Sequence, residues 1–404
     1  MATQSLKFKV RVHAPASEMY RAFTNSTALR DWFCNAAQAD PRKGGRIYLW
    51  WNNGYYASGE FTALVPNSRV TFTWHGRGEP GATRVQVVIA EKDDGAIATI
   101  SHQGIGSGKA WAKASKEIEQ GWRGSLENLQ AVLETGLDLR FVRRPMLGIN
   151  VSFFGAEEAA KLGVPVAQGV RLDGVVDGMG AQKAGLRKDD VIVQMGKTKV
   201  TGFASFARAL QGRRAGDKIP VVFYRGGEKK TVTMELSGRK LPTVPPTARE
   251  LANAVRRLYD ALNAELDELL KGTTEPEASY QPAPNEWNVK ETLAHLIAGE
   301  RANHFALYDF IYDSERAYDH FDNLDNLPAQ TDALVQAYGT TAELVKEFKR
   351  NQAETIAMLA ALPEKFVEHK GTYWRVAVPL LQTDDHTRGH LQQMRAAIEA
   401  ARKK

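Results

Sequence analysis

The chain has 404 residues, more than one hydrophobic core usually supports, so several domains are expected. Its composition, 43% hydrophobic and 25% charged, excludes a disordered or fibrous protein, and a single cysteine, Cys34, excludes a disulfide-rich one. Lysines interrupt the first ten residues and no apolar run is long enough for a membrane span, so we expect a cytoplasmic protein without a membrane partner.

The net charge of +6 is distributed unevenly along the chain. Residues 1–140 carry 17 basic and 13 acidic side chains, residues 141–241 carry 18 and 9, and residues 242–404 carry 18 and 25. The basic middle segment would favour an acidic partner. No segment gathers its basic residues into a stripe with interleaved aromatics, so we expect no nucleic-acid partner.

Two domain boundaries divide the chain. The segment RKLPTVPPTARE (239–250) holds three prolines close together, which is typical of a stiff linker, and GLDLRFVRRP (136–145) separates a helical pattern from a strand-like one. The predicted domains are therefore 1–140, 141–241 and 247–404, with 242–246 as a proline-rich linker.

The first domain begins with a strand, because Leu6, Phe8, Val10 and Val12 alternate with polar residues. A helical stretch, SEMYRAFTNSTALRDWF, and several further strands follow. The domain closes with a long helical pattern, KASKEIEQGWRGSLENLQAVLETG. This order predicts an α+β fold in which a curved antiparallel sheet wraps around its last helix.

These motifs, together with GGRIYLWW, resemble the START-like superfamily, in particular bacterial relatives of the activator of the heat-shock-protein-90 ATPase. The resemblance covers about residues 5–136 and implies a helix-grip fold with an apolar cavity for a small molecule. The alternative is that the aromatic residues simply fill a core. The residues expected to line the cavity are Trp32, Trp50, Trp51, Tyr56 and Trp74.

The middle domain contains short strand patterns broken by glycines, with one helix near 202–211. GAQKAGLRKDDVI and PMLGI resemble a bacterial PDZ domain, a small β-barrel-like fold. The resemblance implies that the backbone of Leu147, Gly148 and Ile149 binds a peptide's terminal carboxylate. The peptide would then add as a strand against a helix carrying Phe206 and Ala209. Alternatively, the domain is a spacer, since the insertion SFFGAEEAAKLGVPVAQ leaves the openness of the groove undecided.

From Thr247 onward, apolar residues recur at helical spacing. A first helix carries Leu251, Val255 and Leu258. Further helices are predicted from about Asn288 to Asp313, from Pro328 to Leu362 and from Val378 to the end. Four such helices predict an up-down bundle with one longer crossover.

Three histidines of this bundle suggest a metal site. His386 and His390 lie four residues apart in DDHTRGHLQQM, on one helical face, as two ligands of one cation require. His295 lies in the apolar stripe of EWNVKETLAHL, where a buried neutral imidazole needs a partner. Glu291, one turn before His295, could orient a ligand or act as a base, but we interpret it as an ordinary surface glutamate. Asp385, next to His386, is interpreted as a helix-terminus residue or as one that supports a ligand. His304 falls on another face.

NEWNVKETLAHL and DDHTRGHLQQM are similar to the two signature helices of the DinB superfamily, metal-binding four-helix bundles, over about residues 247–400. The resemblance implies that His295, His386 and His390 bind one zinc, nickel or iron ion. Enzymes of the superfamily are mainly thiol-dependent transferases and isomerases, which would add a low-molecular-weight thiol as a cofactor.

Together these features predict a multidomain protein that is a metal-dependent thiol transferase, or a hydrolase, with a ligand-binding and a peptide-binding module. The rival hypothesis is a non-enzymatic adaptor or a chaperone-linked protein-recognition factor, in which the metal stabilises the bundle. A third hypothesis is a fusion of independent domains. The sequence leaves the oligomeric state open, with a homodimer as one state typical of such bundles.

Overall fold

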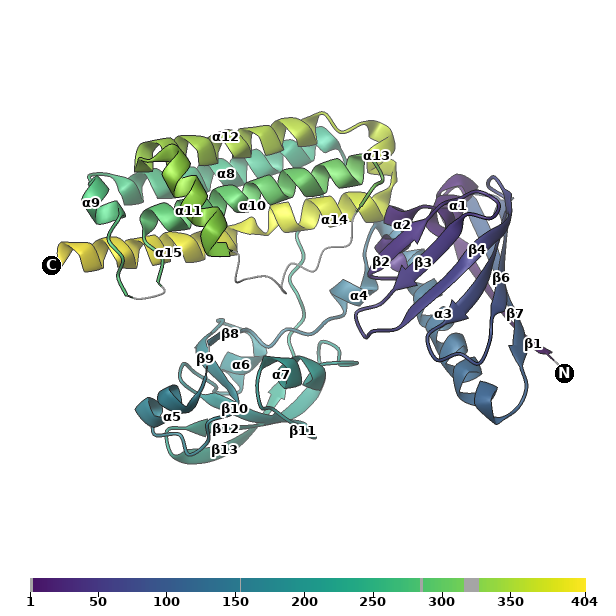
Figure 1. The fold of residues 1–404 in the computed structure, drawn as a ribbon, viewed down its shortest axis with the longest axis horizontal. Helices are drawn as coiled ribbons and strands as arrows, with labels where there is room; N and C mark the ends of the chain where they lie inside the picture. The colour runs from purple at the N-terminus through teal and green to yellow at the C-terminus, as the bar shows by residue number, and fades with distance from the viewer. Residues whose placement is uncertain (1–2, 153, 284–285, 316–326) are drawn as a thin grey trace. The chain divides into compact units, whose positions relative to one another are not determined.

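The computed structural model describes residues 3–152, 154–283, 286–315 and 327–404 (Figure 1). Contacts divide the chain into two compact units. One unit combines Met1–Asp138 with Pro242–Lys404, and the other is Leu139–Leu241. Among the described residues, no helix is both long and apolar enough to cross a membrane.

The N-terminal part of the first unit, here called the sheet domain, is a seven-stranded antiparallel sheet with helices packed on it, as predicted. The strand order is β1-β7-β6-β5-β4-β3-β2. Alternating burial along the strands places one face against the core. The elements are β1 (Thr3–Val12), α1 (Ala16–Thr24), α2 (Ser26–Trp32), β2 (Ala36–Ala39), β3 (Arg46–Trp50), β4 (Tyr56–Val65), β5 (Arg69–Gly76), β6 (Thr83–Lys92), β7 (Gly95–Gly106) and α3 (Lys109–Thr135).

Helix α3 closes the core of the sheet domain. Its buried residues include Ile118, Trp122, Leu126 and Leu129, which recur at helical spacing and share one core with the strands. The helix ends at Gly136, whose positive φ of 80° is the left-handed conformation that commonly terminates helices. A long helix packed on an antiparallel sheet is the helix-grip arrangement expected from the sequence.

The second unit, here called the middle unit, is a small antiparallel sheet with the order β13-β12-β10-β9-β8 and β11 paired to β10. Strand β8 therefore lies at an edge of this sheet. The insertion after β8 forms a short helix, α5. The elements are α4 (Leu139–Val142), β8 (Ile149–Ser152), α5 (Ala156–Leu162), β9 (Val170–Val175), α6 (Gly180–Lys183), β10 (Val191–Met195), β11 (Thr198–Lys199), α7 (Phe203–Ala209), β12 (Lys218–Arg225) and β13 (Glu228–Glu235).

The C-terminal part of the first unit is a helical bundle, as predicted. Helix α8 packs on α12, α12 on α10, α10 on α15 and α15 on α8, which closes a ring of four long helices (Figure 1). The helices are α8 (Ala248–Leu270), α9 (Glu275–Ala278), α10 (Val289–Ile311), α11 (Leu327–Tyr338), α12 (Thr341–Ala360), α13 (Glu364–Glu368), α14 (Lys370–Leu381) and α15 (Thr383–Arg402).

Two predicted helices of the bundle are interrupted. The third is divided at Gly339, where α11 ends and the backbone has a positive φ of 71°. Thr340 then caps α12, because its side chain accepts a hydrogen bond from the Glu343 backbone N–H. The fourth begins earlier than predicted, and α14 gives way to α15 at Gln382, three residues after Pro379. Pro379 lacks the backbone N–H that a continuous helix needs.

Within the first unit, α14 packs against α2 and α3 of the sheet domain. The Thr372 hydroxyl donates a 2.7 Å hydrogen bond to Asp31, and the Arg375 guanidinium donates one of 3.0 Å to the same carboxylate. Arg375 also pairs with Glu315. The bundle and the sheet domain are thus joined by buried polar contacts.

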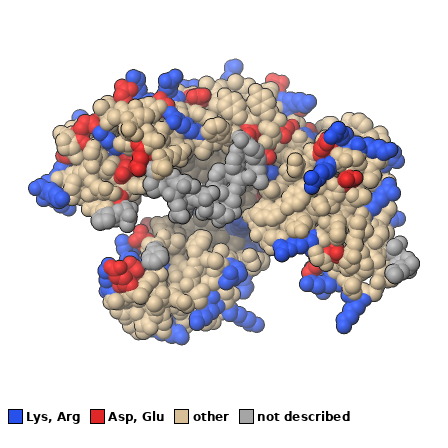
Figure 2. Space-filling model, in the orientation of Figure 1, with Lys and Arg blue, Asp and Glu red and all other residues tan. Residues whose placement is uncertain are grey.

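Figure 2 shows basic and acidic side chains interspersed over the visible face. The described residues on this face form no continuous basic stripe of the kind typical of nucleic-acid binding. The absence of a nucleic-acid partner stays a prediction.

Candidate metal centre

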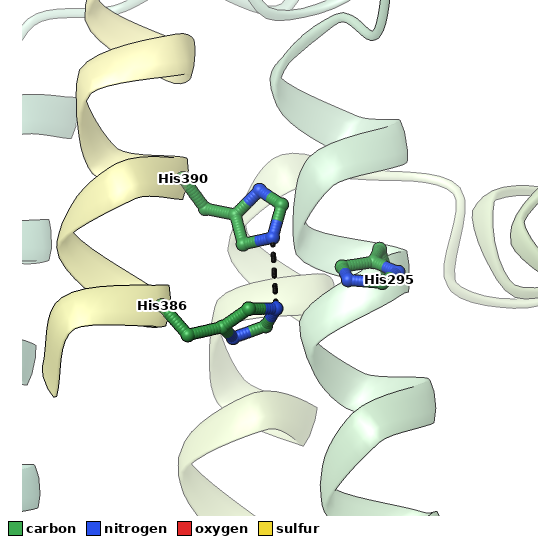
Figure 3. Close-up of side chains that lie close together, drawn as sticks. All are labelled: His295, His386 and His390. Atoms are coloured by element: carbon green, nitrogen blue, oxygen red, sulfur yellow. Dashed lines mark hydrogen bonds between the residues drawn. The ribbon is translucent and has the colours of Figure 1, made fainter. Parts of the chain in front are cut away.

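The three histidines come together between α10 and α15, with His386 exposed and the other two half-buried (Figure 3). His386 and His390 lie one turn apart on α15, and their Nε2 atoms are 3.2 Å apart. His295 projects from α10 toward them, with its ring centroid 4.8 Å from that of His390. One ring nitrogen from each residue lies within 4.8 Å of the other two.

The start of α10 fixes the position of His295. The Asn288 side chain accepts a hydrogen bond from the Glu291 backbone N–H, and the Glu291 carboxylate accepts one from the Asn288 N–H. This capping box satisfies two donors at the helix terminus. Val289 and Leu293 are fully buried, which orients the face that carries His295. Glu291 is therefore occupied as a cap.

The environment keeps the three imidazoles neutral. Burial, followed by the nearby His390 and His386, lowers the pKa of His295 to about 4. Burial, followed by the nearby His390, lowers the pKa of His386. Burial also lowers the pKa of His390, and its hydrogen bond to the Gln393 oxygen opposes this shift. Neutral imidazoles have a free lone pair, which is the form that binds a metal ion.

Hydrogen bonding also fits a metal ligand set. The Nδ1 atom of His295 is buried and has no hydrogen-bond partner among the described residues. The Nδ1 atom of His390 lies 3.0 Å from the side-chain oxygen of Gln393. An amide oxygen only accepts, so Nδ1 carries the proton and the lone pair of His390 is on Nε2, the nitrogen nearest His386.

The spacing agrees with tetrahedral coordination. Two nitrogens bound to one zinc ion at about 2.0–2.1 Å are separated by about 3.3 Å. The 3.2 Å between the Nε2 atoms of His386 and His390 matches this value. The same separation also suits a hydrogen bond in which the Nε2–H of His386 donates to the unprotonated Nε2 of His390. A shared cation would replace this hydrogen bond, with both Nε2 atoms as ligands.

Within the described parts of the chain, this cluster contains three histidines and no carboxylate or cysteine. Three nitrogen ligands suit zinc, nickel or iron and leave a coordination position for an exogenous ligand. The identity of the metal stays a prediction.

Two residues of the site were missed by sequence reasoning. The Trp287 ring lies 4.8 Å from His295 and 6.2 Å from His390, centroid to centroid, and forms an apolar wall beside the cluster. Gln393 orients His390. Trp287 stands within the motif that carries His295, and Gln393 is three residues after His390, a spacing that places two side chains together on a helix.

Two neighbours are placed outside the cluster. Asp385 is exposed in the first turn of α15, where a negative charge favours the helix terminus. His304 is buried one helical face away and hydrogen-bonds to Asn351 and Thr355. Neither belongs to the histidine cluster.

The predicted carboxylate loop lies in the middle unit directly before β8. Gly148 has a φ of 74°, and a Cβ atom there would come within 2.2 Å of the Met179 Cβ. Among the described residues, the backbone N–H groups of Leu147 and Gly148 donate to no backbone carbonyl. Ile149 begins the edge strand β8. Donors of this kind beside an edge strand suit the addition of a peptide.

The two helix residues expected along the peptide groove are buried. Phe206 and Ala209 of α7 share one core with Leu147. Phe203, one turn before Phe206, is 67% exposed, and its ring stacks on Phe206 with a centroid distance of 6.4 Å. The N-terminal turn of α7 therefore presents an aromatic surface to solvent.

The sheet domain contains a cavity of about 490 Å³. Trp51 and Trp74 line it, together with Phe33, Tyr55 and Trp122, which sequence reasoning missed.

Three residues expected to line the cavity do not, and each has a structural reason. Trp32 is 1% exposed in the core, and its indole N–H donates to the Ala22 carbonyl. Trp50 pairs with Tyr56 across β3 and β4. The core face of β3 is occupied by Ile47 and Leu49, so the alternation of a strand directs Trp50 to the other face.

Comparison with protein families identifies all three domains. Residues 13–134 match the family described as activator of Hsp90 ATPase homolog 1-like protein, residues 145–236 match the PDZ domain, and residues 258–396 match the DinB superfamily. The chain therefore carries an AHSA1-like, a PDZ and a DinB-superfamily domain in that order, which confirms the resemblances seen in the sequence.

Similarity to curated proteins is partial. The serine protease Do-like HtrA of Lactococcus lactis subsp. lactis is 34% identical over 101 residues, which are 24% of this chain and 25% of that protein. A probable periplasmic serine protease do/HhoA-like of Haemophilus influenzae is 31% identical over 139 residues, 34% of this chain and 28% of that protein. The chain thus spans about a quarter of the length of these relatives.

Solved structures also match part of the chain. CalU16 from Micromonospora echinospora is 26% identical, with a TM-score of 0.28, and the match covers 32% of this chain and 74% of that one. The Aha1 dimer from Colwellia psychrerythraea is 18% identical, with a TM-score of 0.29, and the match covers 32% of this chain and 96% of that one. TM-scores this low support no functional inference.

Proposed function

We propose that the DinB-type bundle is a metal-dependent thiol transferase. The observation that carries this proposal is the convergence of His295, His386 and His390 from two helices, with one nitrogen of each within 4.8 Å of the others. Three neutral ligands leave room for a substrate sulfur beside the metal. When bound, a divalent ion would supply a Lewis acid that lowers the pKa of a thiol.

The residues of the chain have separate tasks in this reaction. Gln393 holds His390 in the tautomer whose Nε2 faces the site, and Trp287 covers one side of the cluster against water. The thiol loses its proton to solvent, its sulfur forms a bond to an electrophilic carbon, and the leaving group departs with the electrons of the broken bond. The electrophile is not specified by these residues.

The other two domains support a second proposal, that the chain brings partners to this site. Among the described residues, the N–H groups of Leu147 and Gly148 donate to no backbone carbonyl, and their place beside the edge strand β8 favours a C-terminal peptide bound by the PDZ domain. The cavity of the sheet domain favours a small, largely apolar molecule. If the bundle proves inactive, these features support the adaptor hypothesis, in which the metal serves only stability.

The test is an assay of the full chain loaded with zinc, nickel or iron(II). Glutathione, cysteine and bacillithiol serve as thiols and 1-chloro-2,4-dinitrobenzene as the electrophile, with chloride as the leaving group. We expect conjugation faster than that of free thiol, reduced to background by His386→Ala/His390→Ala. The matched control is His75→Ala, which removes an exposed histidine of β5.

Either of two results would overturn the proposal. The first is conjugation at the wild-type rate by the His386→Ala/His390→Ala variant when that variant binds no metal. The second is no conjugation by the metal-loaded chain with any of the three thiols.

A further inference from the structure

The cavity of the sheet domain has a continuous aromatic wall. The Phe33 ring lies 5.3 Å from Trp51 and 5.2 Å from Trp122, centroid to centroid. Trp74 lies 6.3 Å from Trp51 and 6.4 Å from Trp122. Rings at these separations touch one another, and their planes are inclined by 25° to 83°. The wall therefore offers both ring edges and ring faces.

The three indoles of this wall offer no free hydrogen-bond donor. The Nε1–H of Trp51 donates to the Phe33 carbonyl at 2.7 Å, and that of Trp122 donates to the His102 Nδ1 at 3.0 Å. The Nε1–H of Trp74 donates to the Glu79 carboxylate at 3.1 Å. Only ring faces and edges remain for a ligand. A ligand that contacts these three indoles therefore receives no hydrogen bond from them.

Three of the residues that line the cavity are charged. Glu79 and Glu117 are acidic, and Arg77 is the basic residue among those lining the cavity. Glu79 Oε1 accepts from the Tyr55 hydroxyl as well as from Trp74, whereas Oε2 accepts from the Gly76 N–H. A carboxylate oxygen accepts two hydrogen bonds, so Oε2 has one position left. Arg77 is exposed and donates through Nη1 to the Gly54 carbonyl.

A glycine of α3 contributes to the open space. Gly121 lines the cavity in the interior of a 27-residue helix, where glycine is less favourable than alanine. A Cβ atom at this position would meet nothing within 4 Å, so no close contact requires glycine. Gly124, one turn away on the same helix, also has no neighbour within 4 Å and does not line the cavity.

We propose that this cavity binds an aromatic cation, with its ring system against the tryptophans and its charge toward Glu79. Ring faces attract positive charge, and two carboxylates outnumber one guanidinium around the cavity. A cavity of about 490 Å³ is within the range of small-molecule sites. This inference rests on the small-molecule role proposed above for the sheet domain and is independent of the metal site.

The experiment titrates the full chain with proflavine, a three-ring aromatic cation, by isothermal titration calorimetry. Anthracene-2-carboxylate, a three-ring anion, is the matched probe. Gly121→Leu fills the cavity from a helix position without close neighbours, and Gly124→Leu is the control with the same chemical change. Near-ultraviolet circular dichroism reports whether each variant keeps its aromatic packing.

We expect proflavine to bind at least tenfold more tightly than the anion. Gly121→Leu should weaken proflavine binding at least tenfold, whereas Gly124→Leu should leave it unchanged. Tighter binding of the anion would overturn the cationic class and leave the small-molecule role of the domain intact. Binding of neither probe would overturn both, and equal binding by a folded Gly121→Leu variant would place the ligand outside this cavity.

Discussion

Helix α10 carries two histidines with opposite surroundings, one half-buried and one buried. His304 is 9% exposed, and its Nε2 lies 3.1 Å from the Asn351 carbonyl and 3.0 Å from the Thr355 hydroxyl. His295 has a buried Nδ1 without a partner and faces two further imidazoles. The two histidines are nine positions apart on the helix. His304 has hydrogen-bond partners in the fold, whereas the Nδ1 atom of His295 has none among the described residues.

The surroundings of His304 form a closed network. The Thr355 hydroxyl donates to the Glu300 carboxylate at 2.9 Å, and the Tyr259 hydroxyl donates to the same carboxylate at 2.9 Å. Burial raises the pKa of Glu300, opposed by these two hydrogen bonds. Such a network stabilises one arrangement of the core. The comparison shows that hydrogen-bond partners distinguish a structural histidine from a candidate metal ligand better than burial does.

The largest effect is expected from Glu300→Ala, which leaves the hydroxyls of Tyr259 and Thr355 without their buried acceptor. We expect a loss of about 3 kcal/mol in the free energy of unfolding. His295→Ala in the metal-free protein should cost less than about 1 kcal/mol, because it removes a nitrogen that had no partner. Urea unfolding followed by circular dichroism at 222 nm measures both, and equal losses would contradict the comparison.

A third histidine, buried in the sheet domain, extends the comparison. Trp122 donates to Nδ1 of His102, so the proton of this neutral ring is on Nε2, which lies 2.7 Å from the Thr83 hydroxyl. Burial lowers the pKa of His102 from 6.5 to about 4. Below pH 6.5 the unfolded chain therefore binds a proton that the folded chain does not, and stability falls as the pH is lowered toward 4.

The expected loss from His102 is about 3 kcal/mol by pH 4. His102→Gln keeps an acceptor and a donor but does not titrate. The measurement is the unfolding free energy at pH 7 and pH 4.5 by tryptophan fluorescence. The wild type should lose more stability than the variant over this range, and equal losses would show that His102 titrates at its ordinary pKa.

Metal should stabilise the bundle by a slightly smaller amount. Zinc at one hundred times its dissociation constant should add about 2.7 kcal/mol to the free energy of unfolding. His75→Ala should gain the same amount, whereas His386→Ala/His390→Ala should gain none. Thermal unfolding with and without zinc measures the increment. A full increment in the triad variant would mean that zinc binds elsewhere.

The smallest effect is expected from Glu291→Ala. Loss of its bond to the Asn288 N–H should cost about 0.5–1 kcal/mol, since the Asn288 side chain still caps α10. Metal content should stay the same. A fall in metal content without loss of helicity would instead assign Glu291 a role in the metal site.

The sequence predicted those parts that depend on local periodicity. His386 and His390 are placed together by the geometry of one helix, and the order of strands and helices follows from alternation and helical spacing. His102 could also have been placed, because Ala98, Ile100 and His102 lie on one buried face of β7. Strand β7 lies between β1 and β6, so this histidine is inside the sheet rather than at its edge.

Other parts depend on tertiary contacts that no local pattern contains. Both Trp50 and Trp51 were expected to line the cavity, but only Trp51 does. Which of the two faces the cavity depends on where β3 ends, and Trp50 is its last residue. The wall also needs Phe33 after α2 and Trp122 on α3, which are 89 residues apart in the chain and stack in the fold. Likewise, Trp287 reaches His390 only because α10 packs on α15.

The central claim is that the three histidines are ligands of one metal ion. The most direct test is elemental analysis of the purified full chain, after reconstitution with zinc, nickel or iron(II), alongside His386→Ala/His390→Ala and His75→Ala. We predict about one ion per chain in the wild type and in His75→Ala, and less than about one tenth of that in the triad variant. No bound ion in the wild type after reconstitution with any of the three metals would contradict the claim.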